Sequence, residues 1–67
     1  MTEVRVLFDT SIGNWAVLND AMRVSSHDRK QNAERRGRRE AKRNNNRPSE
    51  LVVERKDGTV TYTQRYE

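Results

Sequence analysis

Residues 28–47, DRKQNAERRGRREAKRNNNR, form a strongly basic segment with almost no apolar side chain to bury. Ala33 and Ala41 are its only hydrophobic residues. Residues 29–47 hold nine Lys or Arg against two Glu, a formal charge of +7, whereas the rest of the chain carries −3. Because this segment offers little to a core, we expect the core to come from residues 1–28 and 48–67. A core of that extent is close to the smallest that supports a fold without metals or oligomerisation.

The N-terminal part of the chain has the pattern of one strand followed by one helix. In TEVRVLFD, the apolar residues Val4, Val6 and Phe8 alternate with other side chains, which predicts a strand with one buried face. Trp15, Leu18 and Met22 then recur at i, i+3 and i+7, which predicts an amphipathic helix of about three turns. We expect Trp15 to lie in the core.

The C-terminal part predicts a β-hairpin. Two β-rich runs, ELVVERK and TVTYTQRYE, flank Asp57-Gly58, the dipeptide preferred in two-residue type I′ turns. Closing that turn pairs Glu54 with Thr61 and Val53 with Tyr62. One face of the hairpin then collects the apolar residues Leu51, Val53, Val60 and Tyr62.

Helix length limits how these parts can be joined. A single helix over residues 14–43 would be about 45 Å long, whereas strands of about six residues span roughly 20 Å. The chain could then hardly return to pair the hairpin with the first strand, so we expect a break within 24–28 and less order in 29–43 than in 15–23. The predicted fold class is α+β: a small βαββ unit, in which the N-terminal strand and C-terminal hairpin are covered by the amphipathic helix, with a basic, partly ordered helical segment at 28–43. Residues 1–67 form a single small domain divided into a strand plus helix (1–27), a basic helix and linker (28–47) and a hairpin (48–67).

Several function classes find no support in the sequence. His27 lies beside Ser25, Ser26 and Asp28, but adjacent positions point in different directions and cannot form a catalytic triad, so we expect His27 to face solvent or cap a helix. No spacing of metal ligands and no phosphate-loop glycine pattern is present, so we expect no enzyme activity, metal or cofactor. The absence of cysteine and of any long apolar stretch favours a cytoplasmic protein.

The basic segment itself predicts a polyanion-binding helix. Seven of its nine basic residues are Arg, whose planar fork binds phosphate through two hydrogen bonds. Ala33, Gly37 and Ala41, spaced by four, would form a stripe of small side chains that lets such a helix approach a phosphate backbone. The alternative interpretation is a solvated helix face or a disordered linker. The predicted nucleic-acid contacts are Arg29, Lys30, Arg35, Arg36, Arg38, Arg39, Lys42 and Arg43.

Within this segment, RRGRREAK at residues 35–42 resembles the arginine-rich RNA-binding motif of the lambdoid phage N antitermination proteins. The resemblance implies a helix that grips a small RNA hairpin through Arg35, Arg36, Arg38, Arg39 and Lys42. It also departs from that family, because Gly37 stands where the family has a helix former. The chain as a whole is similar in style to small accessory proteins of T7-like phages, which would place it in the host cell cytoplasm.

The leading hypothesis is therefore a small, non-enzymatic nucleic-acid-binding accessory protein of phage origin, with RNA slightly favoured over DNA. The rival hypothesis is a protein-binding module, either a host-enzyme inhibitor or a small structural component of a phage particle or assembly. Its partner would be a host protein with an acidic surface, and a homodimer stays open as well. This rival rests on the apolar residues left unassigned to the core, namely Leu7, Ile12, Val17, Val24, Val52 and Tyr66.

Overall fold

The computed structural model describes all residues 1–67 and shows a five-stranded mixed sheet with one helix. The elements are β1 (Thr2–Asp9), β2 (Asn14–Asn19), β3 (Met22–His27), α1 (Lys30–Lys42), a short 3₁₀ turn η1 (Asn44–Asn46), β4 (Ser49–Glu54) and β5 (Val60–Tyr66). The strand order is β3-β2-β1-β4-β5. β1 and β4 run parallel, and the other three pairs are antiparallel.

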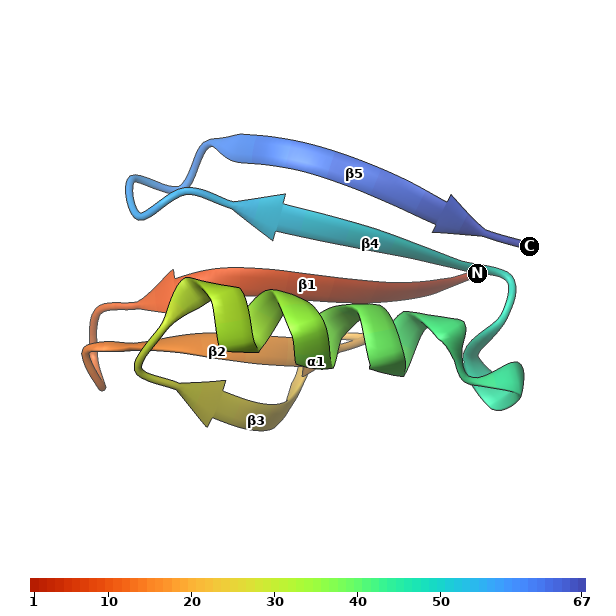
Figure 1. Ribbon diagram of the computed structural model, residues 1–67, viewed down its shortest axis with the longest axis horizontal. Coiled ribbons are helices and arrows are strands. Elements are labelled where there is room, and N and C mark those ends of the chain that lie inside the picture. Colours follow the sequence, from red (N-terminus) through yellow and green to blue (C-terminus); the bar gives the residue numbers. More distant parts are fainter.

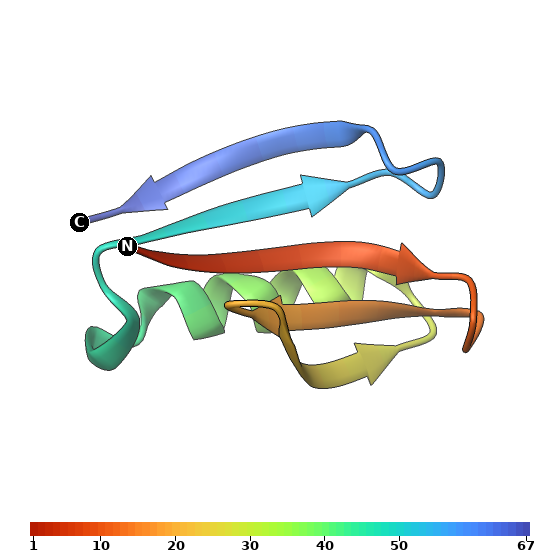
Figure 2. The same cartoon turned by 180° about the vertical axis from the view of Figure 1, so that it is seen from behind.

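The molecule has two layers, because α1 lies across one face of the sheet and nothing covers the other (Figure 1). The view from behind shows the uncovered face (Figure 2). The helix of 13 residues is about 20 Å long, the length of the strands beneath it. It therefore returns the chain to the edge of β1, where β4 pairs in parallel with β1.

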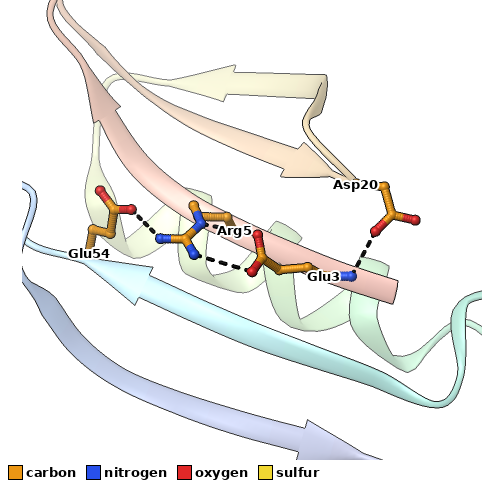
Figure 3. Close-up of polar contacts among 4 residues, drawn as sticks. All are labelled: Glu3, Arg5, Asp20 and Glu54. Atoms are coloured by element: carbon orange, nitrogen blue, oxygen red, sulfur yellow. Dashed lines mark hydrogen bonds and ion pairs between the residues drawn. The ribbon is translucent and has the colours of Figure 1, made fainter. Parts of the chain in front are cut away.

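The predicted βαββ unit is wrong, because the residues expected to form an amphipathic helix form the β2–β3 hairpin. Trp15 and Val17 are buried under α1, while Met22, expected in the core, is 72% exposed. Asp20 and Ala21 join the two strands with φ of 48° and 71°, and a type I′ turn requires positive φ at both central residues. Asp20 also accepts a hydrogen bond from the Glu3 amide at 2.9 Å, which ties the turn to β1 (Figure 3).

The helix contributes to the core, which the sequence analysis did not expect of residues 28–47. Ala33 and Ala41 are fully buried and pack in one cluster with residues of the sheet. The other members of that cluster are Val4, Val6, Trp15, Val17, Leu51 and Val53. The small residues of α1 therefore face the sheet. They do not form the exposed stripe that was predicted to let the helix approach a phosphate backbone.

The segment expected to be partly ordered is a continuous helix that begins at Lys30, directly after β3 and two connecting residues. The expected break of a helix within 24–28 is wrong, because residues 24–27 belong to β3 and the change from strand to helix falls at residues 28–29. Side chains from the following turn satisfy carbonyls at the C-terminal end of α1. Asn46 Nδ2 donates to the Glu40 carbonyl at 2.7 Å, and the buried Ser49 Oγ donates to the Ala41 carbonyl at 2.6 Å.

The C-terminal hairpin has the expected strands with a different loop. Val53 pairs with Tyr62 as predicted, but Glu54 pairs with Val60 and not with Thr61, because a bulge shifts the register there. The Gly58 amide donates to the Arg55 carbonyl at 3.0 Å, and Gly58 has φ of 90°. This is the arrangement of a three-residue loop with a left-handed glycine. Val60 is consequently 48% exposed and does not join the core.

The uncovered face of the sheet carries a cluster of paired charges. Arg5 donates hydrogen bonds to both oxygens of the Glu3 carboxylate at 3.2 Å and also pairs with Glu54 (Figure 3). The hydrogen bonds to Glu3 and then to Glu54 raise the pKa of the Arg5 guanidinium further above its usual range.

The single helix, α1, is too short and too polar to span a membrane.

Candidate nucleic-acid interface

The geometry of α1 places three basic residues directly opposite its buried side. Successive helical residues are offset by about 100°, so positions 35, 39 and 42 point away from the stripe formed by Ala33, Gly37 and Ala41. Arg35, Arg39 and Lys42 are all exposed. Packing of the small residues against the sheet therefore turns these three basic side chains toward solvent.

Ion pairs divide the basic residues of α1 and its C-terminal end into two groups. Arg36 and Arg43 both lie near the buried Glu40, at 3.3 and 3.8 Å, and Arg38 lies 3.8 Å from Glu34. Arg35, Arg39 and Lys42 have no carboxylate within 4.0 Å. The three basic residues without a carboxylate partner are thus the three that point directly away from the sheet.

The two remaining predicted contacts lie at the start of the helix and differ from each other. Lys30 is half-buried, with its Nζ 5.3 Å from the centre of the Trp15 ring and 3.3 Å from Thr61 Oγ1. It therefore closes one end of the core. Arg29 is exposed, and its carbonyl accepts the Ala33 amide at 3.2 Å.

Two shallow hollows lie along α1, and neither has an apolar residue in its lining. The first, of about 270 Å³, is lined by His27, Asn32, Arg35, Arg36 and Arg39. The second, of about 370 Å³, is lined by Arg35, Arg38, Arg39, Lys42 and Arg43. Arg35 and Arg39 border both hollows, so the two form one continuous basic surface.

The sequence analysis missed His27 and Asn32 as members of this surface. His27 is half-buried, and its Nε2 lies 3.0 Å from Ser25 Oγ. It reaches the helix because β3 pairs with β2 and sets His27 opposite Trp15, on the face that α1 covers. For His27, the only signal in the sequence would have been the β2–β3 hairpin itself, whereas Asn32 lies one helical turn before Arg36.

Fold and surface together define a small two-layer domain that presents one basic helix face. The chain belongs to a bacterial family described as "Uncharacterized protein conserved in bacteria (DUF2188)", whose family model matches residues 5–66. No curated protein and no solved structure matches it.

The family match corrects the resemblance to phage N proteins. Residues 35–42 lie inside the matched region and belong to the helix of a folded domain, so they do not place the chain among the phage N proteins. The structure gives the physical reason, since Gly37 and Ala41 within that stretch are buried against the sheet. The arginine pairs occur because the helix has small residues on the side that faces the sheet and basic residues on the side that faces solvent.

Proposed function

We propose that this protein is a nucleic-acid-binding module that holds the phosphate backbone on the outer face of α1. The observation that carries the proposal is the pair Arg35 and Arg39, which are exposed, lack a carboxylate partner and border both hollows. The slight preference for RNA rested on the phage resemblance, so the proposal makes no choice between RNA and DNA.

The outer face has a suitable length for several phosphates. Arg35 and Lys42 are separated by about 10 Å along the helix axis at 1.5 Å per residue. That distance corresponds to about three base-pair steps along the axis of a duplex, at 3.4 Å each. Arg38 and Arg43 lie 3.8 Å from their carboxylate partners and could turn toward a phosphate, because Glu40 would keep Arg36 as a partner at 3.3 Å when Arg43 moves.

The test is binding of a DNA duplex and an RNA hairpin by fluorescence anisotropy across a series of salt concentrations. Five contacts, from Arg35, Arg38, Arg39, Lys42 and Arg43, imply a log–log slope of roughly −4 to −5. Replacing both Arg35 and Arg39 by Ala should reduce the magnitude of the slope by about 2 and weaken binding to every sequence. The melting temperature should stay unchanged, because neither side chain is buried.

The matched control is the double substitution Arg23→Ala and Arg65→Ala. These two arginines are also exposed but lie on β3 and β5, so the net charge changes equally while α1 stays intact. The control should bind with nearly the affinity of the unmodified protein. A flat salt response, or equal weakening by both double substitutions, would refute a localised phosphate site.

A protein with an acidic surface is a second candidate partner. The observation that favours it is the exposure of Met22 and Val24, at 72% and 37%, on the same strand that supplies His27. Apolar contacts beside a basic face suit a protein partner better than a phosphate backbone. Capture of partners from bacterial lysate, with and without nuclease, separates the two, because a protein partner survives nuclease treatment.

A further inference from the structure

The two hollows on α1 differ in the chemistry of their linings. The second is lined only by cations, which attract any phosphate through their charge. The first adds the imidazole of His27 and the amide of Asn32 to three guanidinium groups. The imidazole ring and the amide add hydrogen-bonding groups of a different kind, which act in fixed directions. The first hollow is therefore equipped to select a ligand as well as to attract one.

Its lining also limits what that ligand can be. The lining contains no Phe, Tyr or Trp and no apolar side chain, so the imidazole of His27 and the guanidinium planes are the only surfaces on which a base could stack. No carboxylate borders it either, and the Glu40 partner of Arg36 is only 4% exposed. The hollow thus suits a compact anion that presents oxygen atoms in several directions.

Charge then distinguishes between kinds of phosphate. Arg36 is largely neutralised by Glu40 at 3.3 Å, whereas Arg35 and Arg39 have no carboxylate partner. The remaining charge of two matches a phosphate monoester, which carries about −1.5 to −2 at pH 7. A phosphodiester within a strand carries only one negative charge.

We propose that the hollow at His27 binds a phosphate monoester, the terminal phosphate of a nucleic-acid strand. The backbone phosphates that follow it lie along the second hollow, beside Lys42 and Arg43. This inference rests on the proposed function and adds a preference for strand ends. The position of His27 supports it, because Ser25 holds one ring nitrogen while the other makes no hydrogen bond within the chain.

The experiment compares one single-stranded oligonucleotide in three forms, with a 5′-phosphate, a 3′-phosphate or hydroxyl groups at both ends. Binding of each to the full chain is measured at constant pH and salt. We expect at least one phosphorylated form to bind on the order of tenfold more tightly than the hydroxyl form, because the additional charge-assisted hydrogen bonds form only there. Inorganic phosphate, added alone in an NMR titration, should shift the signals of His27 and Asn32.

Two variants separate the hollow from the general basic face. Replacing His27 and Asn32 by Ala should abolish the preference for a phosphorylated end, while the hydroxyl form still binds through the cations of the second hollow. Replacing Lys42 and Arg43 by Ala should weaken all three forms equally and retain the preference. The single substitution Asn32→Ala, at an exposed position, should lower the preference even if the loss of His27 disturbs folding.

Several results would overturn the inference. Equal binding of all three forms by the unmodified protein would exclude a terminal-phosphate site, yet salt-dependent binding would still support the proposed function. A preference that survives both the Asn32→Ala and the double substitution would place the selectivity elsewhere. If inorganic phosphate shifts His27 and Asn32 while phosphorylated ends gain nothing, the hollow is a site for free phosphate and the terminal-phosphate assignment is wrong.

Discussion

Gly37 is the residue that brings the helix and the sheet together. A Cβ at this position would lie 2.8 Å from Val6 Cγ2 and 3.1 Å from Leu51 Cδ1, both in the core. The first distance is shorter than side chains tolerate without displacement. In the sequence, Gly37 stood out because the family that residues 35–42 resemble has a helix former at this position. In the structure it permits the close approach that orients the arginine face outward.

Replacing Gly37 by Ala should therefore destabilise the protein, although Ala is the better helix former by about 1 kcal/mol. Overpacking a buried site typically costs about 1–3 kcal/mol, so the free energy of unfolding should fall by up to about 2 kcal/mol, measured by urea denaturation. Gln31→Ala, at an exposed position of the same helix, is the control and should change little. If Gly37→Ala were as stable as or more stable than the unmodified protein, helix propensity would outweigh the contact with Val6.

At the scale of elements, two β-turns depend on an aspartate that accepts hydrogen bonds from a residue two positions later. Asp9 accepts from the Ser11 amide at 2.9 Å and from the Ser11 hydroxyl at 2.6 Å. Asp57 accepts from the Thr59 amide at 3.0 Å and from the Thr59 hydroxyl at 2.7 Å. Such Asx turns favour the ionised carboxylate. The Ser11 hydroxyl is the larger cause of the lowered pKa of Asp9, and the Thr59 amide is the larger cause for Asp57.

These pKa values predict how stability depends on pH. A carboxylate with a lower pKa in the folded than in the unfolded state contributes its full stability above the unfolded value of 3.8. That contribution is lost as pH falls through the folded value, so stability should decline below about pH 4. Urea unfolding between pH 5 and 2.5 should show a shallower decline for the double substitution Asp9→Asn and Asp57→Asn. A decline equal to that of the unmodified protein would assign the acid sensitivity to other carboxylates.

The elements also show which parts of the fold the sequence could predict. The strands β1, β4 and β5 could be predicted because the residue patterns of these segments fit a strand and no other element. Asp57-Gly58 marks the loop between β4 and β5. The strands β2 and β3 were not predicted, because this segment fits two patterns. Trp15, Leu18 and Met22 fit the period of a helix, whereas Trp15 and Val17 fit the alternation of a strand equally well. The turn between them places Ala21 at φ of 71°, which few non-glycine residues adopt. Its support comes from Glu3, distant in sequence, so no local pattern indicated it.

Only the solvent-exposed part of the candidate site could be predicted from the sequence. The arginine content of residues 29–43 marked the basic surface, but the inward direction of Ala33, Gly37 and Ala41 depended on an unpredicted sheet. Without β3, no sequence pattern could bring His27 beside Asn32 and Arg35. The residues that distinguish the first hollow from the second are thus the ones that depend on tertiary structure.

Across the whole molecule, the two faces carry different charge. The outer face of α1 is basic, with Arg35, Arg39 and Lys42 unpaired. On the opposite face, the single Arg5 pairs with Glu3 and Glu54, so these three residues carry a net charge of −1 (Figure 3). The domain is therefore strongly polarised, and a polyanion should approach with α1 toward it.

The strand order predicts how stability is distributed through the sheet. β1 lies at the centre, pairs with both β2 and β4 and supplies the fully buried Val4 and Val6. β5 is an edge strand that pairs only with β4, and most of its residues are exposed. Amide hydrogen exchange should therefore be slowest in β1 and β4, through opening of the whole domain, and fastest in β5, through local fraying. Exchange followed by NMR would measure both rates, with β3, the bulged opposite edge, as an internal comparison that should also exchange quickly. Protection of β5 equal to that of β1 would show that the edge is covered in solution, and a dilution series would then reveal whether a second copy of the chain covers it.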